Sequence, residues 1–406
     1  MAFSEVSPAH SAEPQLARPV ELICFALVVA HAVYLATAYF QGIWIVAPNG
    51  SGVASDFVNV WAAGRLALTG HAAAAYDWPA HKLVEETAVG HAVDGYFGWF
   101  YPPTFLFVAA GLSLLTYATA YAVWVFGTFP AYLTAIRAII GDRVGYLLAA
   151  AFPAVLANFI VGQNGFLTAG LVGGALVLLE RRPILAGVLL GLLTFKPHLG
   201  VLFPIALVAS GHWRAFFAAA IVTALMVTAS WIAFGSDTWQ AFFANIGHSS
   251  QAFLSEGWAD WSKLQTAFGL TRTLGGSETL GWTIQAAVTL AAAGAIALLW
   301  RSRAAYDIKA AALGAGAMLA TPYLYTYDLV VLAVPLAFLF RLSRARGFLP
   351  QEMAGIGVAC LLILIFPFVK APVGFAAVLV VAALIARRAL TALSPTKITD
   401  GRVPPA

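Results

Sequence analysis

The sequence predicts an all-α polytopic membrane protein. Hydrophobic residues make up 61% of its 406 residues and charged residues only 10%, whereas a soluble domain carries roughly a quarter charged residues. The mean hydropathy is +0.85, and apolar runs recur between residues 20 and 387, each long enough for a crossing that needs about 20 residues. This composition excludes a soluble enzyme, and short alternating segments typical of a membrane barrel are absent.

The first predicted helix covers residues 20–40, after a polar tail at 1–19 for which we expect disorder. The outer loop at 41–102 contains two stretches, 57–68 and 81–92, with apolar residues at helical spacing. This pattern is typical of amphipathic helices that lie in the membrane interface.

The rest of the chain is a series of apolar segments with one large interruption, a second outer loop at 236–277. A single integral-membrane domain at 20–390, with roughly 10–13 transmembrane helices, is followed by a polar tail at 391–406. The segments after the first loop are 103–116, 118–139, 144–160, 165–180, 183–210, 213–235, 278–300, 306–324, 327–341, 353–369 and 371–387.

Basic residues indicate the orientation, because loops rich in Lys and Arg stay on the cytoplasmic side. Three such groups are separated by two crossings each, so both outer loops face the periplasm of an inner membrane. The groups are Arg301, Arg303 and Lys309; Arg341, Arg344 and Arg346; and Arg387, Arg388 and Lys397. Arg137, Arg143, Arg181 and Arg182 fall on the wrong side unless the short segments 144–160 and 165–180 form a re-entrant pair.

The basic residues, cysteines, histidines and glycines do not predict a nucleic-acid, disulfide, metal or phosphate-loop site. The net charge of +4 lies mostly in short loops, which is typical of topology signals and not of a nucleic-acid surface. Cys24 and Cys360 lie in apolar runs, where buried hydrophobes are expected. No His/Cys cluster has metal-ligand spacing, and no phosphate-binding glycine loop occurs.

Asp56 begins the first amphipathic stretch, next to the membrane and among apolar neighbours. One interpretation is a helix N-cap. The other is a general base, because partial desolvation can tune the proton affinity of a carboxylate at such a place.

Gly162-Gln163-Asn164 separates two apolar segments. It is either a simple polar turn or a pair of amides that bind sugar hydroxyls. Polar groups at membrane depth are costly unless they face a cavity.

Lys196-Pro197-His198 interrupts the apolar run 183–210 near its middle. A lysine at that depth costs about 2.5–3.5 kcal/mol, which favours a functional cation that faces an anionic ligand such as a phosphate. If the run is instead two short helices, we expect Lys196 at the surface and the argument weakens.

A tyrosine-rich stretch runs from Thr321 to Asp328 between two apolar segments. Its tyrosines are ordinary interfacial residues by default. Asp328 either caps the next helix or orients a sugar or supports Lys196.

In order and spacing these pieces resemble glycosyltransferase family 87, of the membrane-embedded GT-C class, over most of the chain. The resemblance rests on Asp56-Phe57, Tyr101-Pro102-Pro103, Gly162-Gln163-Asn164, Gly187 to Gly191 before Lys196-Pro197, and Pro322-Tyr323 with Tyr327-Asp328. It implies a GT-C-type bundle and an inverting enzyme that uses polyprenyl-phosphate-mannose, and in it Asp56 matches the catalytic base.

The expected reaction moves a hexose from a polyprenyl-phosphate donor to a lipid or glycan acceptor. We expect Asp56 as the base, Lys196 and His198 at the donor phosphate, and a set of sugar or acceptor residues. That set is Gln163, Asn164, Tyr101, Tyr323, Tyr327 and Asp328. The phosphate leaving group supplies the activation, so no cofactor is expected and a divalent metal is optional. Membrane lipids are the other partners.

Two other classes share a polytopic hydropathy pattern. A transporter or lipid flippase also uses intramembrane charges, but transporters typically carry repeated halves with paired broken helices, which this sequence lacks. A non-catalytic scaffold would not explain why a lysine, Lys196, interrupts an apolar run.

Overall fold

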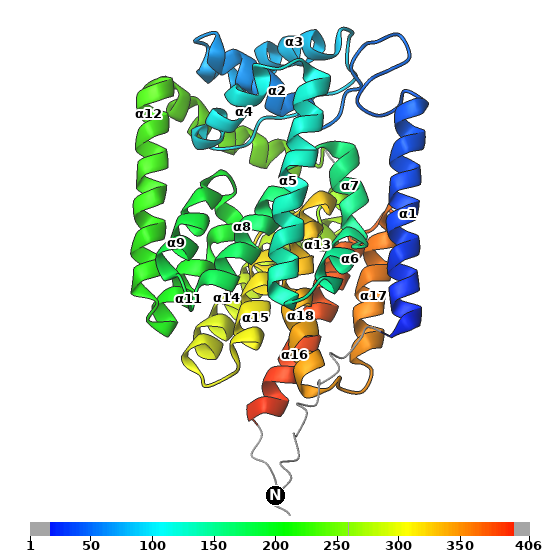
Figure 1. The fold of residues 1–406 in the computed structure, drawn as a ribbon. Coiled ribbons are helices and arrows are strands. Elements are labelled where there is room, and N and C mark those ends of the chain that lie inside the picture. Colours follow the sequence, from blue (N-terminus) through cyan, green and yellow to red (C-terminus); the bar gives the residue numbers. More distant parts are fainter. Residues whose placement is uncertain (1–16, 259, 394–406) are drawn as a thin grey trace, which may run out of the picture.

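The computed structural model describes residues 17–258 and 260–393, and every regular element in this part of the chain is a helix (Figure 1). Six helical stretches are long and apolar enough to cross a membrane, so the chain is a multi-pass membrane protein and the predicted class is confirmed. They are α1 (Arg18–Phe40), α5 (Tyr117–Ile140), α12 (Trp213–Ser250), α14 (Glu278–Arg301), α16 (Ala333–Arg346) with its preceding turn η6 (Thr326–Leu332), and α18 (Val373–Leu393).

The remaining helices of the described bundle are too short to cross a membrane alone. α6 and α7 are bent by 60° at their junction and count as a seventh span if taken together. The predicted segments therefore comprise full spans and shorter helices in similar numbers. The short helices are α4 (Leu106–Ser113), α6 (Val144–Ala150), α7 (Ala154–Val161), α8 (Gly165–Leu178), α9 (Pro183–Gly191), α10 (Pro197–Gly200), α11 (Leu202–Ser210), α13 (Ala267–Thr273), α15 (Tyr306–Leu319) and α17 (Glu352–Ile365).

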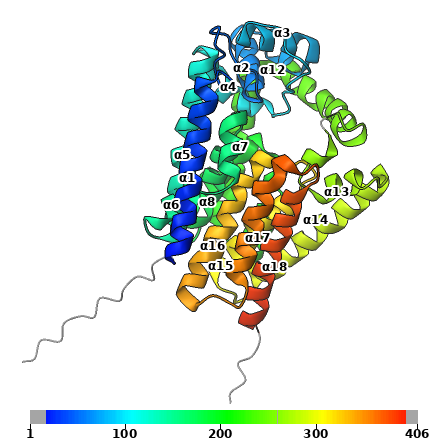
Figure 2. The ribbon, with the colours of Figure 1, turned by 90° about the vertical axis from the view of Figure 1, so that its right-hand side faces the viewer.

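The first outer loop folds into a cap at one end of the bundle (Figure 1). It contains α2 (Phe57–Leu68), the 3-10 turn η1 (Ala72–Tyr76) and α3 (Trp78–Val89). Asp77 caps α3, its side chain accepting the backbone N–H of Ala80 at 3.0 Å. In the perpendicular view, α13 and α14 lie on the side opposite to α1 (Figure 2).

The opposite end of the bundle carries the basic loops. Arg344 pairs with Asp142 and Arg341 with Asp307, and the hydroxyl of Tyr306 donates to the carbonyl of Leu176. These contacts place the loops before α6 and after α8 at the same end as the C-terminus of α16. All the arginine groups therefore lie at this end of the bundle, as expected if the segments 144–160 and 165–180 turn back without crossing. The 60° bend between α6 and α7 fits either a broken span or a re-entrant loop.

The predicted tails, 1–19 and 391–406, lie outside the described residues except at their inner ends. There α1 begins at Arg18, and α18 continues to Leu393. The stretch Thr326–Arg346 is 83% buried, so α16 forms the centre of the bundle, around which the other helices pack.

Candidate active site

Three breaks between short helices point to a single region beneath the cap. They are the turn at 162–164 between α7 and α8, the turn at Lys196 between α9 and α10, and the stretch 321–328 between α15 and α16. A Cβ on Gly165 would lie 2.5 Å from the carbonyl oxygen of Tyr327. Only glycine therefore lets the first and third breaks pack this closely.

Asp56 lies at the cap side of this region and does not act as an N-cap. It precedes α2, but its side chain makes no capping hydrogen bond. Instead the side-chain amide of Gln163 donates to its Oδ2 at 3.3 Å. Desolvation raises the pKa of Asp56 to about 6, against the opposing effects of this hydrogen bond and of the nearby Lys263 charge. A half-buried carboxyl with this pKa is suited to accept a proton near neutral pH.

Tyr101 fixes the orientation of Gln163. Its hydroxyl donates to Gln163 Oε1 at 2.7 Å, so the NH₂ group of the amide is directed at Asp56. Both Tyr101 and Gln163 are buried. The three residues form a continuous hydrogen-bonded chain from the first outer loop to the turn at 162–164.

Gly162 holds this turn against the start of α2. Its φ is +68°, and a Cβ there would lie 2.6 Å from Cβ of Phe57. The indole of Trp124 donates to the carbonyl of Gly162 at 3.0 Å. A side chain at this position would be strained and would clash, which explains the glycine in front of the two amides.

Asn164 is 1% exposed, and neither atom of its amide has a hydrogen-bond partner among the described residues. Buried side-chain amides are nearly always satisfied. An unpaired amide beside Gln163 is therefore a candidate for binding a polar ligand.

The apolar run 183–210 is broken into short helices, which is the alternative that the sequence left open. Lys196 lies at the break, immediately before α10. The surface position expected for that alternative is wrong, because Lys196 is 3% exposed. The hairpin tip is covered by the stretch 321–328, so a break in the hydropathy run does not expose the side chain.

Asp328 neutralises this lysine and also caps its own helix. Its Oδ1 accepts a short hydrogen bond from Lys196 Nζ, and its Oδ2 accepts the backbone N–H of Tyr325 at 3.1 Å. Nζ of Lys196 also lies 5.3 Å from the ring centre of Tyr327. Both sequence interpretations of Asp328 therefore describe a real contact.

His198 and Tyr323 make fewer contacts with the other predicted site residues. His198 is half-buried in α10, close enough to Lys196 and Asp328 to feel their charges. Tyr323 packs against the small cluster of Leu254, Leu264 and Phe268, so it faces the second outer loop.

Two residues missed by the sequence analysis lie at the site. Tyr325 stacks on Tyr327 with ring centres 5.7 Å apart. Lys263 is exposed in the second outer loop, forms no ion pair with another described residue, and lowers the pKa of Asp56 by its charge. A single lysine in a polar loop gives no sequence signal, so only the fold could identify it.

An apolar groove of about 590 Å³ borders the Lys196 hairpin. Pro102 and Thr104 line it near the cap, Pro197 lines it beside the lysine, and α9, α11 and α12 supply most of the rest. A long apolar chain could lie in this groove while a polar head reaches the site. Within 17–258 and 260–393, no group of three or more His, Cys, Asp or Glu residues could hold a metal ion.

Comparison with known proteins identifies the family. The model of glycosyltransferase family 87 matches residues 99–322, more than half of the chain. This range contains Tyr101, Gln163 and Lys196 but not Asp56 or Asp328. Neither a curated protein nor a solved structure matches the chain. The protein is a membrane glycosyltransferase, not a transporter or a scaffold: the chain belongs to glycosyltransferase family 87.

Proposed function

We propose that the enzyme transfers a hexose, most simply mannose, with inversion from a polyprenyl-phosphate donor to a lipid or glycan acceptor. The reaction takes place at the periplasmic face of the inner membrane, in a single GT-C-type domain at 20–390. The observation that carries this proposal is the half-buried Asp56, which Gln163 holds and which lies close enough to Asp328 to feel its charge. Asp328 pairs with the buried Lys196, whose neighbour Pro197 lines the apolar groove.

In the proposed step, Asp56 removes the proton from an acceptor hydroxyl as its oxygen attacks C1 of the sugar. The bond between C1 and the phosphate oxygen breaks on the opposite face, and polyprenyl phosphate leaves with the bonding electron pair. Attack from the opposite face inverts the configuration at C1. The carboxylate supplies base catalysis, and positive charge near the phosphate stabilises the leaving group.

Lys196 and His198 contact the donor phosphate in this proposal. Because Asp328 already balances the charge of Lys196, the departing phosphate needs further positive charge. We assign this role to Lys263, whose charge acts on Asp56. Asp328 then serves mainly to hold Lys196 in position.

The sugar and acceptor are positioned by the polar groups around Asp56. The side-chain amides of Gln163 and Asn164 offer donors and acceptors to hydroxyls. Both amide atoms of Asn164 lack a hydrogen-bond partner among the described residues. The tyrosines at 101, 323 and 327 contribute flat faces and hydroxyls. The apolar groove beside Pro197 holds the polyprenyl chain.

The test uses purified protein with labelled polyprenyl-phosphate-mannose and a panel of lipid acceptors from the native membrane. We expect labelled product and stoichiometric release of polyprenyl phosphate. Asp56→Asn should abolish transfer with folding retained, whereas Asp94→Asn, an exposed carboxyl in the same outer loop, should leave it intact. Transfer by Asp56→Asn at the wild-type rate would refute Asp56 as the base, and transfer only from a nucleotide sugar would refute the donor class.

A further inference from the structure

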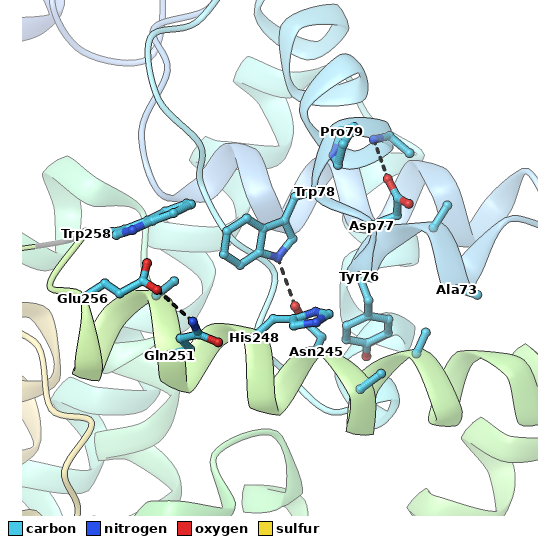
Figure 3. A pocket seen from close by; sticks show the side chains of 15 residues that line it. Ala73, Tyr76, Asp77, Trp78, Pro79, Asn245, His248, Gln251, Glu256 and Trp258 are labelled. Atoms are coloured by element: carbon cyan, nitrogen blue, oxygen red, sulfur yellow. Dashed lines mark hydrogen bonds between the residues drawn. The ribbon is translucent and has the colours of Figure 1, made fainter.

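A second depression lies outside the Asp56 site, between the two outer loops. It is a groove of about 800 Å³ with one wall formed by η1 and the start of α3 and the other by the end of α12 and the turn after it (Figure 3). Its lining includes Tyr76, Asp77, Trp78, Gln251, Glu256 and Trp258 (Figure 3).

Two tryptophans form the aromatic part of this groove. Trp78 is fixed from two sides: its ring stacks on Tyr96 at 5.0 Å, and its indole N–H donates to Asn245 at 3.0 Å. Trp258 meets Trp78 edge to face at 5.5 Å but is 64% exposed. The two rings are inclined at 66° to each other, and the exposed indole of Trp258 offers a flat apolar face that suits the C–H face of a sugar ring.

The polar groups of the groove include two carboxylates, Asp77 and Glu256, besides two side-chain amides and the imidazole of His248. Glu256 Oε1 accepts from the amide of Gln251 at 2.9 Å, and Asp77 Oδ1 accepts from the N–H of Ala80. Each carboxylate keeps capacity for further donors. Two carboxylates repel a phosphate but bind hydroxyl groups well, so the groove favours a neutral saccharide over an anionic headgroup.

The groove wall is connected to the proposed base. The hydroxyl of Tyr76 donates to the carbonyl of Tyr101 at 2.8 Å, and the hydroxyl of Tyr101 donates to Gln163, which in turn bonds Asp56. Two tyrosines therefore separate the groove from the site.

We propose that this groove binds a saccharide portion of the acceptor, so that the acceptor is a glycan or a glycolipid headgroup and not a plain lipid alcohol. The inference rests on the proposed function, because it treats the groove as the acceptor side of the Asp56 site. The fixed Trp78 and the exposed Trp258 hold the sugar face, and the two carboxylates accept its hydroxyl protons in hydrogen bonds.

The experiment is saturation-transfer NMR on the full chain in lipid nanodiscs, with the methyl α-glycosides of mannose, glucose and galactose as probes. We expect a saturation-transfer signal from at least one probe. The affinity for that probe should be about fivefold weaker in Trp258→Ala, whereas Trp258→Phe should keep most of the wild-type affinity. Trp213→Ala, at the other end of α12 and 49% exposed, is the matched control and should bind like the wild type.

Asp56→Asn separates the two proposals, because it should lose sugar transfer and keep saccharide binding. Binding that persists while the wild type transfers no sugar would count against the proposed function alone. Absence of saturation transfer to all three probes, or equal binding by Trp258→Ala and the wild type, would overturn the saccharide groove.

Discussion

The side-chain amide of Gln163 donates a hydrogen bond to the carboxylate of Asp56 across 107 positions of the chain. This contact joins the cap to the membrane-embedded bundle at the point where three helix breaks meet. It gives Asp56 a fixed direction, and it is the contact on which the proposed chemistry most directly depends.

The pH dependence of transfer should follow the titration of Asp56. Only the ionised carboxylate can accept a proton, and desolvation raises its pKa to about 6. We expect kcat/KM to rise about tenfold per pH unit below 6 and to level off above it. Initial rates between pH 4.5 and 8 test this. A profile that is flat across pH 6 would contradict the assignment.

Asp56→Asn should also leave the fold at least as stable as the wild type at pH 8. A carboxyl whose folded pKa lies above its unfolded value favours folding when protonated, and this contribution is lost as the pH rises through 6. The neutral side-chain amide of Asn does not lose this stability at high pH. Melting temperatures of both proteins in nanodiscs at pH 8 test the prediction. A much lower melting temperature for Asp56→Asn would contradict the conclusion that the Asp56 carboxylate is desolvated.

Gln163→Ala should reduce kcat by about tenfold to a hundredfold, because the base loses its orienting partner. The amide stabilises the charged carboxylate, so its removal should also move the inflection of the pH–rate profile upward. The exposed Gln240 provides a matched control, Gln240→Ala, for which no change is expected. An unchanged inflection in Gln163→Ala would show that the contact does not tune Asp56.

The buried pair of Lys196 and Asp328 should behave as one unit in a double-mutant cycle. Removal of either partner leaves an uncompensated buried charge and should cost about 3–5 kcal/mol of stability. Lys196→Met combined with Asp328→Asn should recover much of that stability but no transfer, since the cation is absent. Denaturation and transfer assays on all four proteins test this. Additive destabilisation would contradict the pairing.

If Lys263 supplies charge to the donor phosphate as proposed, Lys263→Ala should raise KM for the donor and make donor binding less sensitive to salt. Lys263→Arg should retain most of the affinity. Lys309→Ala, on the opposite basic face, controls for a general change in charge. Equal donor KM in Lys263→Ala and the wild type would remove Lys263 from the phosphate site.

A buried pair in the cap should give the protein a second pH response. His81 and Glu85 are fully buried, with Nδ1 and Oε1 3.4 Å apart, and desolvation lowers the pKa of His81 to about 4 and raises that of Glu85 to about 8. The Glu85 contribution to stability is lost as the pH rises toward 8. Glu85→Gln should therefore flatten the fall in melting temperature between pH 6.5 and 8.5. A fall as steep as in the wild type would refute this.

The sequence alone was sufficient for the class of the protein and for its family. The class follows from hydropathy, which depends only on the composition of long windows of sequence. The family follows from short motifs, such as those around Gln163 and Lys196, whose order along the chain can be read without knowing the fold. The sequence therefore predicts Asp56, Gln163 and Lys196 as site residues without any information on their contacts.

Only the tertiary structure decided which apolar segments cross and which residues touch. Hydropathy cannot distinguish one spanning helix from two short ones, so it left both open for the run around Lys196. It also gave no sign that a break between two short helices would be buried. The pairing of Lys196 with Asp328 joins positions 132 residues apart, and the approach of Lys263 to Asp56 depends on how an outer loop folds back. Such contacts arise from packing between distant segments, and no local pattern in the chain encodes them.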